Sequence, residues 1–188
     1  MIRIRQATKD DAPAIARVRV DCWRTTYRDL IPDAYLDGMD VDASARLWDR
    51  VLSAPPNATS VYVADDAGEL VGFAAGNRLE EPRYALDAEL SAAYVRADRQ
   101  RMGIGRKLVD AVARAQQANG AHGLIVWVIA GNKAGRAFYE GLGGALLVEQ
   151  PFEWDGMPLT EAGYGFADID ALVRACESEG RPDDATVH

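Results

Sequence analysis

Short apolar runs, several of them alternating with polar residues, predict seven strands along this chain. Residues 2–7 alternate apolar and charged side chains with a period of two, as a half-buried strand does. The later runs are bounded by glycine, proline, asparagine or aspartate, which commonly end strands. We expect strands at 2–7, 61–64, 70–74, 89–95, 123–129, 145–154 and 158–167. The turns at 65–68 and Asp155–Gly156 predict two hairpins, and the charged segment around Glu80-Glu81-Pro82 predicts a loop.

Apolar residues at intervals of three and four predict helices between these strands. Thr8 and Asp11 have the spacing of a capping box, so a first helix is expected to begin there. Pro55-Pro56-Asn57 marks the end of a second helical region, because proline cannot continue the helical hydrogen-bond ladder. The helices are expected at about 11–27, 33–54 with a break at 38–42, 103–119, 132–142 and 168–179. The polar tail 180–188 has no periodicity and is expected to be disordered.

Composition and length fit one globular domain. Of the 188 residues, 48% are hydrophobic and 27% are charged, values typical of a single domain. No apolar run approaches the ~20 residues that span a membrane, and the N-terminus lacks the core of a signal peptide, so we expect a cytoplasmic protein without a membrane segment. Cys22 and Cys176 have neither a disulfide nor a metal-binding spacing, so no metal is expected. The net charge of −8 argues against nucleic acid as a partner and mildly favours a cationic small molecule or basic peptide.

The segment Gln100-Arg101-Met102-Gly103-Ile104-Gly105 lies between a predicted strand and a predicted helix. The first N–H groups of a helix have no intrahelical partner, and the helix dipole adds partial positive charge there, so the segment suits a phosphate or pyrophosphate. Two common phosphate motifs do not fit. A dinucleotide fingerprint needs a third glycine where this chain has Leu108, and a P-loop needs Gly-Lys-Ser/Thr, whereas Lys107 follows Arg106.

The remaining pattern, Gln/Arg-x-x-Gly-x-Gly/Ala, resembles the acyl-CoA pyrophosphate loop of the GNAT (Gcn5-related N-acetyltransferase) superfamily. A second signature of that family, a strand followed by asparagine and a helix ending in Tyr-x-x-Leu-Gly, is matched by Asn132 and by 137–143 after the apolar run 124–128. The first strand and helices also resemble those of many bacterial members. The resemblance covers residues 1–168 and implies the GNAT fold, a mixed α/β domain with a mostly antiparallel sheet of about seven strands flanked by helices. Residues 169–179 are expected to pack as a helix on the same domain.

The resemblance implies acetyl-CoA as the acyl donor and a set of residues that hold it. The pyrophosphate would contact the loop formed by Gln100, Arg101, Met102, Gly103, Ile104, Gly105 and Arg106, with the two arginines adding charge at its rim. The pantetheine arm would pair with the backbone of Tyr94 and Val95, hydrogen-bond to Asn132, and pass near Phe138. Taken alone, these last four residues also fit simpler roles, namely sheet residues, a helix N-cap and a core aromatic.

Acetyl transfer to an amine requires removal of a proton before attack. A lysine-like amine has a pKa near 10.4, so about one molecule in 10³ is nucleophilic at neutral pH, which corresponds to about 4 kcal/mol. Glu89 is the predicted general base, with Glu80 and Glu81 as alternatives. By the resemblance, Tyr139 would protonate the departing thiolate. His122 is interpreted as a turn residue and neither cysteine lies in a histidine-containing motif, so the amine is expected to attack the thioester directly.

The acceptor is the least determined part of this prediction. The resemblance implies that the first two helices and the late hairpin shape its site, and Trp23, Tyr27 and Trp154, with Tyr35, fit an aromatic-walled cleft there. Asp37 or Glu153 would attract a cation; helix and hairpin packing is the competing interpretation of all these residues. The alternative function is a noncatalytic acyl-CoA sensor or interaction module. An O-acyl acceptor and a homodimer formed through the late strands also remain open.

Overall fold

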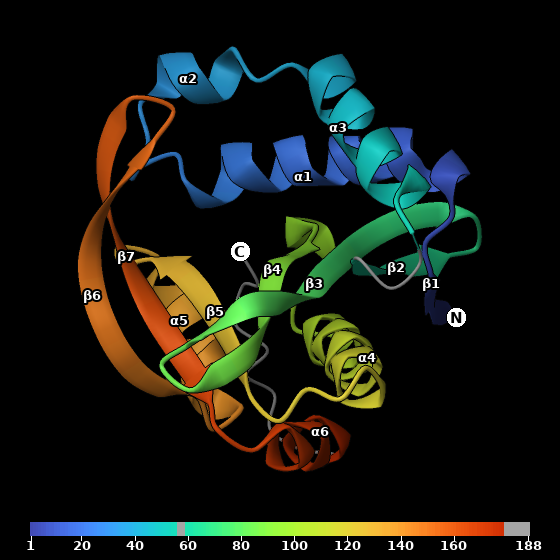
Figure 1. The fold of residues 1–188 in the computed structure, drawn as a ribbon. Coiled ribbons are helices and arrows are strands. Elements are labelled where there is room, and N and C mark those ends of the chain that lie inside the picture. The colour runs from blue at the N-terminus through green and yellow to red at the C-terminus, as the bar shows by residue number, and fades with distance from the viewer. Residues whose placement is uncertain (56–58, 179–188) are drawn as a thin grey trace.

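The computed structural model describes residues 1–55 and 59–178, which form one seven-stranded sheet flanked by helices (Figure 1). The strand order is β1-β2-β3-β4-β5-β7-β6, and every neighbouring pair is antiparallel except β4 and β5. The predicted fold class, a mixed and mostly antiparallel α/β domain, is therefore confirmed. The strands are β1 (Ile2–Gln6), β2 (Ser60–Asp66), β3 (Glu69–Arg83), β4 (Leu86–Val95), β5 (Leu124–Ile129), β6 (Ala145–Trp154) and β7 (Met157–Phe166).

Helices cover both faces of the sheet and divide the core into two clusters. On one face lie α1 (Ala12–Thr26), the short α2 (Asp33–Asp37) and α3 (Val41–Ser53), which pack around Phe73 and Tyr94. The other cluster includes residues of α4 (Ile104–Ala118), α5 (Lys133–Gly141) and α6 (Ile169–Glu177). Each predicted helix is present, with ends that differ from the prediction by one or two residues, and the break between α2 and α3 is shorter than expected. None of the helices in the described part of the chain is long and apolar enough to cross a membrane.

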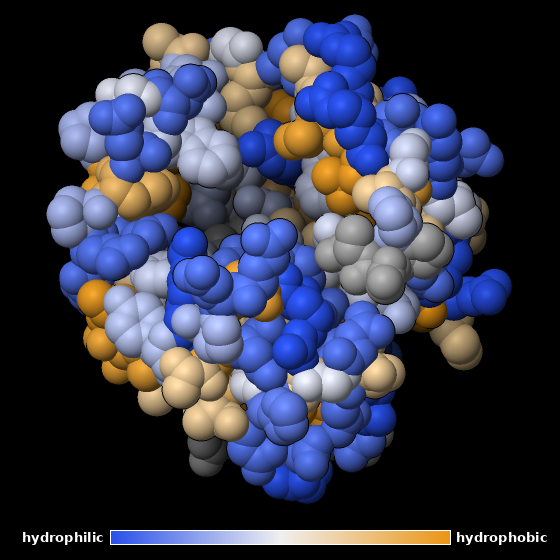
Figure 2. Space-filling view, in the orientation of Figure 1, coloured by the Kyte–Doolittle hydropathy of each residue, from blue (hydrophilic) through white to orange (hydrophobic). Residues whose placement is uncertain are grey.

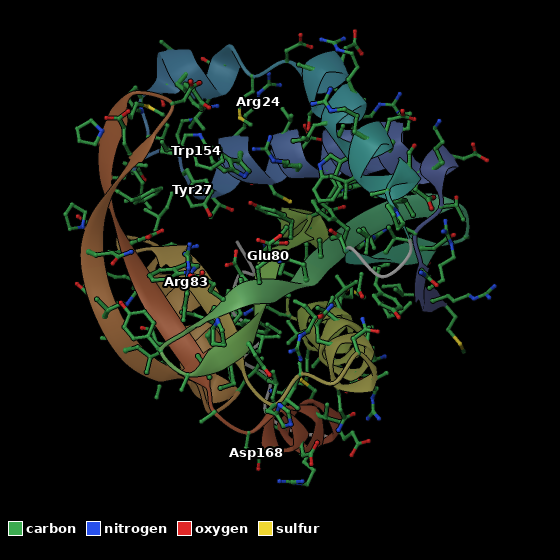
Figure 3. All side chains as sticks on the ribbon, viewed as in Figure 1. Arg24, Tyr27, Glu80, Arg83, Trp154 and Asp168 are labelled. Atoms are coloured by element: carbon green, nitrogen blue, oxygen red, sulfur yellow. The ribbon has the colours of Figure 1, made fainter. Side chains whose placement is uncertain are left out.

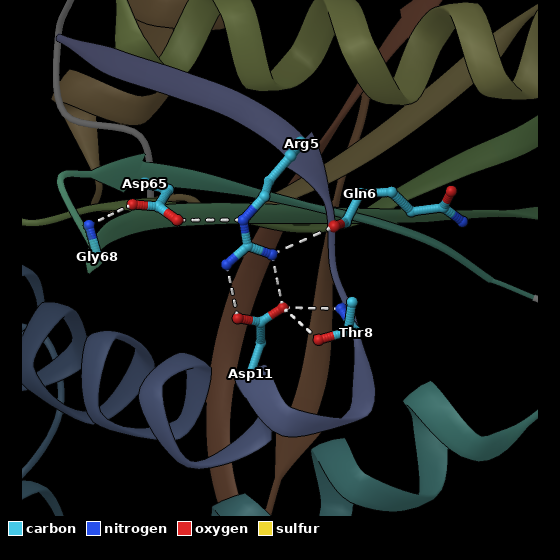
Figure 4. A network of polar contacts seen from close by, with 6 residues as sticks. All are labelled: Arg5, Gln6, Thr8, Asp11, Asp65 and Gly68. Atoms are coloured by element: carbon cyan, nitrogen blue, oxygen red, sulfur yellow. Dashed lines mark hydrogen bonds and ion pairs between the residues drawn. The ribbon is translucent and has the colours of Figure 1, made fainter.

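The start of α1 is fixed by a polar network around Arg5 (Figure 4). The guanidinium of Arg5 donates two hydrogen bonds of 2.8 Å to the carboxylate of Asp11 and one of 3.1 Å to Asp65. The backbone N–H of Thr8 donates to Asp11 at 2.7 Å, which is the contact that the predicted capping box requires. Hydrogen bonding from Arg5 holds the pKa of Asp11 below its usual value despite partial burial. A 3₁₀ turn, η1 (Lys9–Asp11), precedes the helix itself.

The segment 80–82 is not a loop, so this prediction was wrong. It belongs to the outer part of β3, which forms an arm with the start of β4, and Arg83 is paired with Leu86. Tyr84 and Ala85 close the arm with φ values of 53° and 62°. The end of the arm is exposed, so its charged residues carry no apolar signal that would reveal a strand.

The second predicted hairpin is present as β6 and β7. Asp155 and Gly156 have φ values of 49° and 79°, the left-handed pair that a two-residue type I′ turn requires. The hairpin reaches the α1–α2 side, where the indole N–H of Trp154 donates to the hydroxyl of Tyr35 at 2.9 Å. The predicted tail 180–188 and the Pro56-Asn57 part of the predicted helix end lie outside the described residues.

Candidate active site

The central feature of the site is a divergence between the two parallel strands. β4 and β5 are paired only at Ala88–Leu90 and Leu124–Val126. Beyond these residues β4 continues to Val95 along β3, while β5 continues to Ile129 along β7. β4 and β5 therefore diverge after Leu90, beside the segment 91–95 that includes the predicted pantetheine contacts Tyr94 and Val95.

The predicted phosphate loop lies directly after this segment. Gly103 is the N-cap of α4 with φ 75°, a left-handed conformation that glycine adopts without strain, and Arg101 has φ 62°. The side-chain amide of Gln100 donates to the carbonyl of Val95 at 3.0 Å and so ties the loop to the end of β4. Arg101 and Met102 are exposed, whereas Ile104 and Gly105 are buried in the first turn of α4. The N–H groups of that turn are available in the way any helix N-terminus offers them.

The Arg106 side chain does not match its predicted place at the rim. Its guanidinium donates to the carbonyl of Ala175 at 2.9 Å and to that of Ser178 at 3.4 Å. These carbonyls lie at the C-terminal end of α6, where a positive charge interacts favourably with the helix dipole. This contact has a tertiary cause, because α6 packs beside α4 and its C-terminal carbonyls accept from the Arg106 side chain.

The side chain of Asn132 fits both of its predicted roles, the N-cap of a helix and a hydrogen-bond donor to the pantetheine arm. Its Oδ1 accepts the backbone N–H of Gly135 at 3.0 Å, so it is the N-cap of α5. Its Nδ2 is fully buried and has no hydrogen-bond partner of normal geometry among the described residues. A Cβ on Gly135 would lie 2.7 Å from that Nδ2, so the glycine makes room for the amide. Phe138 is a core residue, 3% exposed, packed edge-to-face on Tyr139.

Three tyrosines converge beside Asn132. Tyr139 is completely buried, and burial together with the nearby Tyr94 raises its pKa well above 10. Burial likewise raises the pKa of Tyr27, which Tyr94 and Tyr139 raise further and the Asn132 amide lowers. The Tyr94 hydroxyl accepts a hydrogen bond of 2.9 Å from the indole N–H of Trp23. Phenols with raised pKa values stay protonated at neutral pH, so Tyr139 can donate a hydrogen bond but cannot serve as a base.

An aromatic cleft of about 300 Å³ lies between α1, α3, β4, β5 and the β6–β7 hairpin. It contains all three predicted acceptor residues, Trp23, Tyr27 and Trp154, and the Trp23 ring lies 5.0 Å from Tyr27 and 5.2 Å from Trp154. Figure 2 shows a hollow near the centre of the view, and in Figure 3 Tyr27 and Trp154 lie on its α1 side. Tyr94, which was expected to contact the donor, also lines the cleft. The remaining lining residues were not expected in the site: Arg19, Leu47, Trp48, Ser91, Ala92, Trp127, Val128, Ile129, Phe152 and Glu161.

The acidic group of the cleft is Glu161 of β7, and neither predicted acid lines it. Asp37 instead pairs with Arg28 at 3.0 Å on the exposed side of α2. Glu161 carries no sequence signal that distinguishes it from other acidic strand residues, since its position depends on the pairing of β7 with β5 at Ile129. Its carboxylate accepts a hydrogen bond of 2.8 Å from Gln150.

Glu89 lies in β4 opposite Ile125, within the last paired residues before the strands diverge. Burial raises the pKa of its carboxyl, the charge of Glu161 raises it further, and the charge of Arg83 lowers it. A raised pKa makes a carboxylate a stronger base. The alternative bases Glu80 and Glu81 lie on the exposed arm, and Figure 3 places Glu80 and Arg83 across the opening from Tyr27.

Cysteine and metal chemistry find no support in the described residues. Cys22 is buried in α1, and burial raises the pKa of its thiol to about 12, so it is not a nucleophile at neutral pH. Cys176 is likewise buried. Among residues 1–55 and 59–178 no three histidine, cysteine, aspartate or glutamate side chains gather as metal ligands.

Both the sequence and the fold of this chain are similar to those of known proteins. Residues 16–143 match the model of the Acetyltransferase (GNAT) family. The chain is 35% identical over 174 residues to the uncharacterized N-acetyltransferase YuaI of Bacillus subtilis (strain 168), which covers 92% of this chain and 96% of the relative. Its fold is similar to the PaiA N-acetyltransferase of Thermoplasma acidophilum in complex with coenzyme A (TM-score 0.66, 19% identity, 86% and 98% of the two chains). It is also similar to that of YncA, a putative acetyltransferase of Salmonella typhimurium, in its structure with acetyl-CoA (TM-score 0.66, 20% identity). That match covers 97% of this chain and 98% of YncA. The chain therefore belongs to the GNAT family of acetyltransferases.

Proposed function

We propose that this enzyme transfers the acetyl group of acetyl-CoA to a primary amine of a small molecule or peptide, by direct attack in a ternary complex. One observation carries the proposal. The end of β4, beyond its pairing with β5, joins the loop at Gln100 to the aromatic cleft, because Val95 accepts the Gln100 amide while Tyr94 lines the cleft. A donor lying along this end of β4 would present its thioester to an amine in the cleft. The similar structures of PaiA and YncA hold coenzyme A and acetyl-CoA, respectively.

The chain offers three kinds of contact for the donor. The first N–H groups of α4, around Gly103 and Gly105, suit the pyrophosphate. The backbone of Tyr94 and Val95 can pair with the amides of the pantetheine arm in the manner of an added strand. The buried Nδ2 of Asn132 has no hydrogen bond of normal geometry among the described residues, and a pantetheine carbonyl would accept one from it.

The transfer itself needs one base and one hydrogen-bond donor. Glu89, directly or through a water molecule, takes a proton from the acceptor ammonium. The neutral nitrogen then attacks the thioester carbonyl carbon, the C–S bond breaks, and the sulfur leaves as a thiolate that Tyr139 protonates. Loss of the second proton from the nitrogen yields the amide, so amine and acetyl-CoA give N-acetylamine and free coenzyme A. Desolvation of Glu89 favours the first proton transfer, because it raises the pKa of the carboxyl.

Thiol release from acetyl-CoA, measured across amines, amino acids, peptides and alcohols, tests the proposal. We expect turnover with at least one amine, while acetyl-CoA binding without turnover on any class would support the noncatalytic sensor. Turnover with alcohols alone would identify an O-acyl acceptor.

Calorimetric titration of Gly105→Asp with coenzyme A tests the loop. We expect its affinity to fall at least tenfold, because a carboxylate would face the pyrophosphate. Gly141→Asp is the control for the added charge, since it lies in α5 at an exposed position where a Cβ would meet no atom within 4 Å apart from its chain neighbours and its own helix backbone. Wild-type affinity in Gly105→Asp would refute the loop assignment.

A further inference from the structure

Arg19 is the cationic side chain of the aromatic cleft. It lies in the middle of α1, one turn before Trp23, and is partly buried. It lines the 300 Å³ cleft and also a neighbouring cavity of about 470 Å³ between α1, α2 and α3, and Leu47 is the other residue common to both. Arg19 therefore lies between the aromatic cleft and this neighbouring cavity.

The Arg19 guanidinium lies over an aromatic ring and forms no ion pair within the described part of the chain. Its Cζ lies 4.9 Å from the centre of the Trp23 ring. A cation–π contact of this kind does not itself satisfy the N–H donors of the guanidinium. Among the ion pairs of residues 1–55 and 59–178 none includes Arg19; of the two acidic residues that line the neighbouring cavity with it, Asp40 and Asp155, Asp40 pairs with Arg46. By contrast, Arg24 of the same helix donates to the carbonyls of Leu36 and Met39.

Charge in the cleft is arranged with opposite signs on two walls. Arg19 enters from α1 and Glu161 from β7, and among the described residues they are the charged ones that line the cleft. The wall between them is largely aromatic, and aromatic faces also favour an ammonium group. A volume of about 300 Å³ is at the small end of ligand pockets, so it suits a compact molecule.

We propose that the acceptor is a small amino acid, a compound with a primary amine and a carboxylate, and that Arg19 binds the carboxylate while the amine points toward Glu161 and Glu89. This deepens the proposed function and rests on it. The fork of Arg19 would form two charge-assisted hydrogen bonds with the carboxylate and so fix which end of the molecule meets the thioester. An aliphatic or aromatic amino acid side chain would occupy the aromatic wall, because both charged groups of the cleft are then already used.

Matched acceptors test the proposal: L-amino acids, and, for each one that is acetylated, its amide and its decarboxylated amine. We expect the wild-type enzyme to favour the amino acid by about 10- to 100-fold in kcat/KM. Arg19→Gln should remove this preference by lowering kcat/KM for the amino acid, while the amide and the amine change about threefold or less. Arg19→Lys should restore part of it, since the charge remains and the fork is lost. Arg17→Gln is the control, an exposed arginine of the same helix, and should leave all three values unchanged.

Three results would overturn the proposal. The first is equal or better turnover of the amide or amine in the wild-type enzyme. The second is an equal loss on all three acceptors in Arg19→Gln, which would indicate a structural role for the stacked arginine. The third is turnover of peptides or polyamines with none of any amino acid. If no acceptor releases thiol, the proposed function fails instead. Calorimetry of L-amino acids in the presence of coenzyme A then decides the inference: binding that Arg19→Gln abolishes supports it, and absence of binding refutes it.

Discussion

Asp87 fastens the start of β4 to the start of β5, just before the strands diverge. Its Oδ1 accepts the backbone N–H groups of His122 at 2.9 Å and Gly123 at 3.1 Å. Its Oδ2 lies 3.0 Å from the ring Nδ1 of His122 and 3.3 Å from the guanidinium of Arg78. The side chain is only 15% exposed. We predict that Asp87→Asn destabilises the protein, because the charge that organises these donors is lost.

The pKa of Asp87 sets the size of the effect. Burial raises this pKa, but hydrogen bonds from Gly123 and His122 and the charge of Arg78 lower it more, from 3.8 to about 2. That difference corresponds to about 2 kcal/mol of unfolding free energy at pH 7. Because the pKa is lower in the folded protein than in the unfolded chain, this stability is complete above about pH 5. It is lost as the pH falls through 4 toward 2.

Urea unfolding of the wild-type protein and Asp87→Asn at pH 7, 4 and 3 measures this. We expect the variant to be less stable by about 2 kcal/mol at pH 7, and the difference to shrink by roughly half at pH 3. Asp49→Asn is the control, since the Asp49 carboxylate is 49% exposed and pairs with Lys9 at 3.6 Å; its effect should stay within about 0.5 kcal/mol. Wild-type stability of Asp87→Asn at pH 7, or a difference that does not change with pH, would refute the reasoning.

Three further predictions concern the site. Tyr139→Phe should lower kcat by about 10- to 100-fold and change the affinity for acetyl-CoA little, because the hydroxyl acts on the leaving sulfur; an unchanged kcat would remove it from the mechanism. Arg83→Gln should move the acid limb of the kcat/KM profile to higher pH. The positive charge of Arg83 lowers the pKa of Glu89 in the wild-type enzyme, so the pKa rises when that charge is removed; an unmoved limb would mean that another group is the base. Gly135→Ala should weaken coenzyme A binding in calorimetry, because its Cβ would meet the Asn132 Nδ2 at 2.7 Å, and wild-type affinity would show that this amide does not contact the donor.

Much of the donor side could be predicted from the sequence because its features are local. A glycine at the N-cap of α4 and an asparagine at the N-cap of α5 depend on residues that are neighbours in the chain. The turn at Asp155–Gly156 was predictable for the same reason, since its φ values are a property of those two residues. The arm of β3 was not, because its exposed charged residues become a strand only by pairing with β4.

The side chains that face the acceptor could be predicted only in part. Trp23, Tyr27 and Trp154 were expected together, and they do line one cleft. Arg19 and Glu161 were not expected there, nor was the engagement of Arg106 with α6. Which charges face each other across a cavity depends on strand register and helix packing, and neither is encoded in the spacing of a few residues.

The sequence by itself thus determined the element order, the family and the loop that suits a pyrophosphate. Helix caps and glycine conformations act over a few residues, so a short motif is enough to specify them. Only the tertiary structure decided where the cleft opens and which charges line it. β5 stays paired with β7 along its full length but leaves β4 after Val126, and the β5–β7 register places Glu161 in the cleft that Arg19 of α1 also lines.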